Sequence, residues 1–168
     1  MAQRLIDKQG ATPLLIAGIA RSPLLIHYGS DRFVPEKVLP VKNDNGVKPK
    51  KEGGLWTSPV DSKYGWKQWN DIERFRACHE SNSFTVCLKP NSRIFVIDSF
   101  LDLKSAPLID GDHGVRVLDF ECIAKNYDAI WLTKKGYDEA EFTYPINLYA
   151  WSCETVLLLN PNCCTAVY

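Results

Sequence analysis

The chain lacks the features that mark membrane-spanning, repetitive and metal-binding proteins. Its apolar stretch Thr12–Ala20 is too short to cross a bilayer and is interrupted by Pro13 and Gly18. The six cysteines include no C-x-x-C pair, so their spacing predicts no metal site. No secretory signal, internal repeat or low-complexity tract is evident. We therefore expect one domain over residues 1–168, with residues 1–21 as an N-terminal extension, located in the cytoplasm or delivered into a host cell, and no membrane partner.

The chain also carries no net charge, because 20 Lys and Arg balance 20 Asp and Glu, so the total does not indicate a dedicated nucleic-acid binder. The distribution is uneven, however. Residues 1–97 hold 15 basic and 9 acidic residues, whereas residues 98–168 hold 5 and 11, which leaves about +6 and −6. Two interpretations follow: oppositely charged solvated faces, or a cleft that binds a diphosphate on its basic side and stabilises a cation on its acidic side.

Short apolar runs bounded by Gly, Pro, Ser and Asn predict a series of strands. They cover residues 23–28, 55–57, 83–88, 93–97, 129–133 and 155–159, with a further edge strand at 163–167. A helix is predicted from Ser58, as N-cap, to about Arg76, because Pro59 suits its first turn. A second helix is expected near 118–126, whereas residues 134–141 form a polar segment to which the pattern assigns no helix. Short strands mixed with two or three helices, without regular alternation, indicate the α+β class.

Three short strings, far apart in the chain, place chemically distinctive side chains at strand ends. They are LLIHYGS (24–30), GGLWTSP (53–59) and CETVLLL (153–159). His27 ends an apolar strand just before a Gly-Ser turn, Trp56 lies on a strand just before a helix start, and Glu154 is a lone carboxylate at the head of a buried strand. In order and setting, the strings resemble the ADP-ribosyltransferase superfamily, in its His–aromatic–Glu branch of diphtheria-toxin-like and poly(ADP-ribose)-polymerase-like enzymes.

The resemblance extends from about Leu24 to the C-terminus. It implies an ADP-ribosyltransferase-like split β-sandwich, in which two antiparallel sheets with flanking helices surround an NAD cleft. It also implies the transfer of ADP-ribose from NAD, the substrate, to a macromolecular acceptor, a protein or a nucleic acid, with release of nicotinamide and no need for a metal. Such a reaction requires a grip on nicotinamide, alignment of the dinucleotide, and a negative charge beside the developing ribose cation.

Within this family, the resemblance makes Glu154 the catalytic carboxylate that bonds the ribose 2′-hydroxyl. A second acidic pair, Glu139 and Glu141, also has the Glu-x-Glu spacing of the arginine-specific branch. That branch places its pair at the start of the strand, whereas these two residues lie in the polar segment. The resemblance therefore favours the His–aromatic–Glu branch. Without the family, the residues favour the interpretation of Glu154 as a carboxylate that merely marks the entrance of a strand.

The resemblance assigns His27 to the ribose at the adenosine end, and the next glycine to backbone contacts with the nicotinamide amide. Here Tyr28 separates His27 from Gly29 and Ser30, so the string is one residue longer than the common His-Gly-Ser or His-Gly-Thr. Either Tyr28 or Gly29 supplies the backbone contacts, and only glycine allows a very close approach. A lone histidine on an apolar strand otherwise indicates a core residue.

The first nicotinamide-stacking tyrosine of the family is matched by Trp56, in Gly-Leu-Trp. The second stacking aromatic is expected in the next helix, where Trp66 is the candidate and Tyr64 its neighbour. Ser62 and Lys63 match a Ser-Lys pair of the polymerase-like members. A cationic ring gains about 0.5–2 kcal/mol from an aromatic face. Packing within the helix is the alternative role for Trp66 and is favoured for Trp69.

Three other functions remain open from the sequence. The same residues can hydrolyse NAD with water as the acceptor, or the chain can bind ADP-ribose or a protein partner without turnover. A thiol hydrolase using Cys78 or Cys153 with a histidine is a further class. Within the transferase hypothesis, the resemblance implies that residues 142–153 select the acceptor, through aromatic side chains. These are Tyr144, Tyr149 and Trp151.

Overall fold

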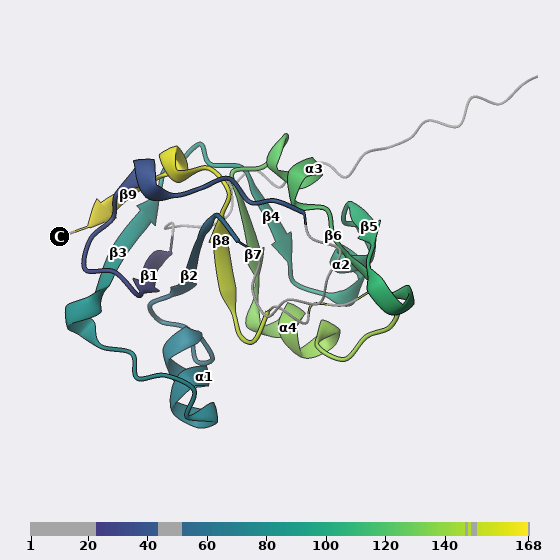
Figure 1. Ribbon diagram of the computed structural model, residues 1–168, viewed down its shortest axis with the longest axis horizontal. Coiled ribbons are helices and arrows are strands. Elements are labelled where there is room, and N and C mark those ends of the chain that lie inside the picture. Colours follow the sequence, from purple (N-terminus) through teal and green to yellow (C-terminus); the bar gives the residue numbers. More distant parts are fainter. Residues whose placement is uncertain (1–22, 44–51, 147, 149–150, 168) are drawn as a thin grey trace, which may run out of the picture.

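The computed structural model describes residues 23–43, 52–146, 148 and 151–167 (Figure 1). The predicted N-terminal extension lies outside these residues. The strands are β1 (Leu24–Tyr28), β2 (Leu55–Pro59), β3 (Ser83–Leu88), β4 (Ile94–Ile97), β5 (Leu108–Asp110), β6 (Arg116–Leu118), β7 (Ala129–Leu132), β8 (Thr155–Leu158) and β9 (Cys164–Val167). The helices are α1 (Trp66–Glu73), α2 (Phe100–Ser105), α3 (Phe120–Ala124) and α4 (Lys134–Ala140), with short 3₁₀ turns at 35–37, 80–82, 112–114 and 161–163. The α+β class is confirmed.

The main sheet differs from the expected pair of antiparallel sheets. Seven strands form one hydrogen-bonded series in the order β4-β7-β8-β2-β1-β3-β9, and β4 runs parallel to β7. A separate two-stranded sheet, β5-β6, lies beside α2 (Figure 1). The sheet is mixed because the 31-residue connection from β4 to β7 is long enough to return the chain in the same direction. Although only a turn-like segment separates β3 from β4, the two strands pair with different partners.

The pairing of β1 with β2 is short and decides where the sheet opens. The register joins Leu25 to Pro59 and Ile26 to Ser58, and it does not continue to the residues that follow in β1. On the other side, β2 pairs with β8 over three residue pairs, from Leu55 to Thr57. Strands β1, β2 and β8, which carry the three strings of the sequence, are therefore neighbours in the sheet.

The predicted helix from Ser58 to Arg76 is wrong at both ends. Residues 55–59 are a strand, because Ser58 and Pro59 pair with β1, and α1 begins only at Trp66 with Gly65 as its N-cap. The hydroxyl of Ser58 nevertheless accepts a hydrogen bond from the Trp66 backbone N–H, at 2.9 Å. Ser58 thus satisfies one of the unpaired N–H groups at the helix start from a distant position in the chain. In Figure 1, α1 lies beyond the ends of β1 and β2.

Two helices were missed by the sequence pattern. Helix α4 occupies the polar segment, where Thr133 accepts a hydrogen bond from the Gly136 N–H and caps the helix. Its buried positions, Gly136, Tyr137 and Ala140, are too few and too unusual to produce a clear apolar period. Helix α2 begins after Ser99, whose hydroxyl accepts from the Asp102 N–H. In the described part of the chain, no helix is long and apolar enough to span a membrane.

The core consists of two clusters of buried side chains. The larger cluster packs α2, α3 and α4 against the strands β4, β7 and β8, and includes the fully buried Ile97, Ile130 and Leu157. The smaller cluster includes Leu25, Val86 and Val156, from β1, β3 and β8. Because side chains alternate between the faces of a strand, β8 contributes Leu157 to one cluster and Val156 to the other.

Asp128 connects the ends of three strands, β4, β7 and β8. Its carboxylate accepts hydrogen bonds from the Arg93 backbone N–H at 2.9 Å and from the Asn160 amide at 3.1 Å. Burial acts to raise the pKa of Asp128, but these bonds and the Arg93 guanidinium outweigh it and hold the pKa below its ordinary 3.8. A carboxylate that is more acidic in the folded state stabilises the fold above its unfolded pKa, and this stabilisation is lost as the pH falls.

We therefore expect Asp128→Asn to lower the free energy of unfolding by about 1–2 kcal/mol at pH 7, the loss typical of hydrogen bonds to a charged group. The difference between wild type and variant is expected to shrink as the pH falls below the ordinary pKa of 3.8, where the unfolded chain takes up the proton, and to disappear only below the lower pKa of the folded state. Urea unfolding at pH 7 and pH 3 measures both values. A difference that stays constant between the two pH values would contradict this role of the charge.

Candidate functional site

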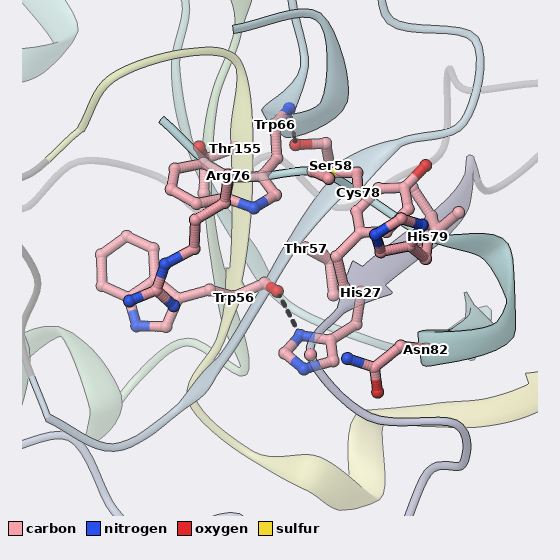
Figure 2. A pocket seen from close by; sticks show the side chains of 14 residues that line it. His27, Trp56, Thr57, Ser58, Trp66, Arg76, Cys78, His79, Asn82 and Thr155 are labelled. Atoms are coloured by element: carbon pink, nitrogen blue, oxygen red, sulfur yellow. Dashed lines mark hydrogen bonds between the residues drawn. The ribbon is translucent and has the colours of Figure 1, made fainter. Parts of the chain in front are cut away.

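A cavity of about 320 Å³, here called the first cavity, lies where β1 and β2 separate beyond their short ladder. It is lined by His27, Tyr28 and Gly29 at the end of β1, by Trp56 on β2 and by Trp66 on α1, among others (Figure 2). The volume falls within the range of small-molecule sites. The structure thus brings together five of the residues that the sequence nominated for binding NAD.

The side chain of His27 bridges the two separating strands. Its Nδ1 atom lies 2.8 Å from the carbonyl oxygen of Trp56, as the dashed line in Figure 2 shows. A carbonyl oxygen only accepts, so Nδ1 carries the proton of this bond. In a neutral ring, Nε2 is then the acceptor nitrogen. The ring also packs against Phe84, at 4.9 Å between centroids. These contacts define both the tautomer and the orientation of His27.

The two indoles of the first cavity are each supported by another tryptophan. Trp66 stacks on Trp69, with centroids 5.0 Å apart and an interplanar angle of 20°. Trp56 meets Trp151 edge-on, at 5.1 Å and 61°. Trp69 thus covers one face of Trp66. Trp69 therefore packs within the helix, and Trp66 does so while also lining the cavity.

Gly29 occupies a backbone conformation that favours glycine. Its φ is +123°, a region that L-residues rarely adopt, and its N–H donates to the Asn82 carbonyl at 2.9 Å. The preceding Tyr28 lines the first cavity as well. Burial raises the pKa of Tyr28, and the nearby Cys78 adds to the effect, so the phenol stays protonated at neutral pH. Tyr28 and Gly29, the two candidates for backbone contacts with nicotinamide, therefore line the same cavity.

Glu154 lines a second cavity, of about 750 Å³, together with Pro59 at the end of β2 and Trp131 on β7. Its carboxylate accepts hydrogen bonds from Ser62 Oγ, at 2.6 Å to Oε2, and from Trp131 Nε1, at 3.1 Å to Oε1. Its backbone N–H donates to the Tyr64 carbonyl at 3.0 Å. Its carbonyl oxygen accepts a hydrogen bond from Ser58 Oγ at 3.0 Å. Glu154 is thus held at four atoms while its side chain remains only partly buried.

The sequence-nominated residues are therefore divided between neighbouring cavities. Ser58 and Thr155 line the first cavity, and the next residues along each strand, Pro59 and Glu154, line the second. The carboxylate of Glu154 and the ring of His27 therefore line different cavities.

Three further nominated residues lie outside the first cavity. Ser62 lines the second cavity beside Glu154. Ser30 lines a third cavity, of about 320 Å³, which also contains Arg32 and which shares His27 with the first. Tyr64 contacts Glu154 only through its backbone, and its ring packs against Tyr137.

The structure adds residues that the sequence did not nominate for an NAD site. Trp131 bonds Glu154, although an indole in an apolar strand carries no signal of that role. Arg76, Cys78 and His79 follow α1 in irregular chain and line the first cavity (Figure 2). Cys78 had been considered only as the nucleophile of a thiol hydrolase. The other such candidate, Cys153, is buried against Thr155.

The alternative acidic pair lies away from all three cavities. Glu139 accepts a hydrogen bond from the Phe100 backbone N–H, and Glu141 accepts one from the Tyr137 hydroxyl. Burial and this bond to Glu141 raise the pKa of Tyr137. Both carboxylates therefore serve local packing around α4.

Among the aromatics of residues 142–153, Trp151 is buried in the larger core cluster and Tyr144 is 74% exposed. Tyr149 lies outside the described residues. Of these two described candidates, Tyr144 is therefore the one that is exposed to solvent.

Within the described residues, no group of three or more His, Cys, Asp or Glu side chains is arranged to hold a metal ion. Comparison of the chain with protein-family models, with curated proteins and with solved structures found no match.

Proposed function

We propose that this protein transfers ADP-ribose from NAD to a macromolecular acceptor and releases nicotinamide. The observation that carries the proposal is the convergence of the three sequence strings on adjacent strands, β1, β2 and β8. Their side chains lie around one strand boundary, although residues 27, 56 and 154 are far apart in the chain. In the family that the strings resemble, NAD is the substrate. An aromatic side chain there binds nicotinamide, a histidine aligns the dinucleotide, and a carboxylate stabilises the ribose cation.

The sheet supports the finer fold interpretation of a split sandwich. Strands β9, β3 and β1 form one half, and β2, β8, β7 and β4 form the other. The halves are joined through only two residue pairs, and the first cavity opens directly beyond them. The cavity at the split is where the proposal places nicotinamide, between the faces of Trp56 and Trp66.

The proposal places the scissile bond between the first and second cavities. With nicotinamide in the first cavity, its ribose lies near Ser58 and Thr155, one residue from Glu154 along β8. The adenosine end then extends past His27 towards the third cavity, which His27 also lines. The acceptor nitrogen Nε2 of His27 suits a ribose hydroxyl, because a hydroxyl can donate to it.

In the proposed reaction, the glycosidic C–N bond breaks and its electron pair leaves with nicotinamide, which becomes neutral. The ribose carbon becomes part of an oxocarbenium cation, which the negative charge of Glu154 stabilises. The acceptor nucleophile then forms a bond to this carbon and loses its proton to Glu154 or to solvent. Water in place of the acceptor would give NAD hydrolysis by the same residues.

Nicotinamide release from NAD tests the proposal. The purified chain is incubated with NAD, and free nicotinamide is measured by chromatography. Transfer to an acceptor is then distinguished from hydrolysis by adding radiolabelled NAD to a cell lysate and following label in macromolecules. Binding of ADP-ribose without any nicotinamide release would make the chain a binding module and would overturn the proposal.

Trp66→Ala is expected to raise the KM for NAD about 2- to 30-fold, with a smaller effect on kcat, because one aromatic face over the cationic ring is lost. Initial rates of nicotinamide release measure both constants. Ile72→Ala is the matched control, since Ile72 lies on the same helix and is 63% exposed. An unchanged KM in a folded Trp66→Ala variant would argue against stacking at this position.

A further inference from the structure

Two neutral side chains hold the carboxylate of Glu154 from different parts of the fold. Ser62 approaches Oε2 from the segment after β2, and Trp131 approaches Oε1 from β7. Each oxygen therefore has its own donor. Ser62 was nominated by the sequence for cofactor binding, whereas nothing in the sequence connects Trp131 with the site.

The register of the sheet explains why the indole reaches Glu154. In the antiparallel β7–β8 ladder, Trp131 lies opposite Val156, and Glu154 is two residues before Val156. Residues two apart on a strand share a face, so Trp131 and Glu154 are diagonal neighbours on that face. Such pairs lie about 7–8 Å apart, a distance that aromatic side chains can span. The body of the indole packs against the smaller core cluster, while its N–H reaches the second cavity.

The donors orient the carboxylate without neutralising it. In the part of the chain that the structure describes, no Lys or Arg forms an ion pair with Glu154. An Arg or Lys partner would cancel the negative charge that a ribose cation needs, and would compete with that cation. Hydroxyl and indole N–H groups lack a formal charge, so they restrict the rotation of the side chain and leave its charge available.

We propose that Trp131 is a positioning residue that, together with Ser62, holds the Glu154 carboxylate at the boundary of the two cavities in the orientation that the reaction needs. This inference rests on the proposed function for its catalytic consequence. The hydrogen bond between the Trp131 indole N–H and the Glu154 carboxylate does not depend on catalytic activity.

Trp131→Phe tests the catalytic consequence, since it keeps an aromatic ring in the core and removes only the donor. We expect kcat for nicotinamide release to fall about 10-fold, which corresponds to about 1.4 kcal/mol, while the KM for NAD changes less than 2-fold. Trp131→His, which retains a ring N–H, is expected to recover part of the loss. Trp69→Phe is the matched comparison. Trp69 stacks on Trp66, so this substitution is expected to alter the KM for NAD rather than kcat.

The indole N–H resonances in a ¹⁵N–¹H NMR spectrum test the hydrogen bond independently of activity. The chain has five tryptophans, and the signal of Trp131 is the one missing from the Trp131→Phe spectrum. It is expected to move upfield in Glu154→Ala, because the charged acceptor is gone. The chemical shifts of the other four indoles are expected to remain nearly unchanged.

The outcomes separate the two proposals. If the wild type releases no nicotinamide but the Trp131 signal responds to Glu154→Ala, the proposed function fails and the hydrogen bond stands. If the wild type is active and Trp131→Phe retains full kcat, the positioning role is wrong and the proposed function stands. If the indole N–H chemical shift of Trp131 is unchanged in Glu154→Ala, the inference is wrong whatever the activity of the wild type.

Discussion

Glu154→Gln is expected to slow nicotinamide release by about 10² to 10³, the loss typical when one electrostatic contact to a transition state is removed. The change is nearly isosteric. The amide oxygen of Gln can still accept from Trp131, and its NH₂ group can donate to the Ser62 hydroxyl, so the side chain is expected to keep its place. Only the negative charge is lost. The rate of nicotinamide formation under saturating NAD measures the effect.

Glu139→Gln provides the matched control for this experiment. Glu139 is the other acidic residue that the sequence raised as a catalytic candidate, and it lies in α4, where it accepts from the Phe100 N–H and pairs with Lys135. We expect its substitution to leave the rate within about 2-fold of wild type. Full activity of Glu154→Gln would remove the carboxylate from the mechanism, and loss of activity in Glu139→Gln alone would point to the other acidic pair.

Gly136→Ala is expected to destabilise the fold by about 3 kcal/mol, at the upper end of the usual cost of overpacking. A Cβ atom at this position would lie 2.0 Å from the carbonyl oxygen of Ile97 and 2.8 Å from its carbonyl carbon. These are backbone atoms of β4, which cannot rotate away as a side chain can. Helix α4 would have to move off β4, although both pack in the larger core cluster.

Helix propensity alone predicts the opposite sign for this substitution, because alanine is favoured over glycine in a helix by about 1 kcal/mol. The experiment therefore separates local preference from tertiary packing. Thermal unfolding is expected to show a fall in Tm of roughly 6–12 °C for a chain of this size. Gly111→Ala is the control, since its φ of −103° suits any residue. A stabilised Gly136→Ala variant would show that α4 does not dock closely on β4.

The seven strands of the main sheet were predictable because each carries its own signal, whereas the short strands β5 and β6 were not predicted. The run Leu24–Tyr28 is apolar and ends in Gly-Ser, and Thr155–Leu158 is buried at every position and ends at Asn-Pro. Such runs indicate a strand wherever they lie in a fold. The helix expected near 118–126 was found as α3 for a similar reason, because Asp119 caps it locally by accepting from the Cys122 N–H.

The errors arose where distant residues decide the local structure. Ser58 and Pro59 are a good helix start in isolation, yet their pairing with Ile26 and Leu25 makes them the end of a strand. Helix α4 depends on Gly136 fitting against β4, and its sequence is otherwise too polar to indicate a buried element. In both cases, contacts across the sheet outweigh the local preference of the residues involved.

By itself, the sequence determined seven of the nine described strands and nominated the candidate site residues, because strand patterns and residue types are local properties. It placed His27 at a strand end and Glu154 at a strand head, and the structure agrees with both positions. The tertiary structure alone decided which strands are neighbours, that Glu154 and His27 face different cavities, and that Trp131 bonds Glu154. These features depend on the register between strands, which is set by contacts between residues far apart in the chain.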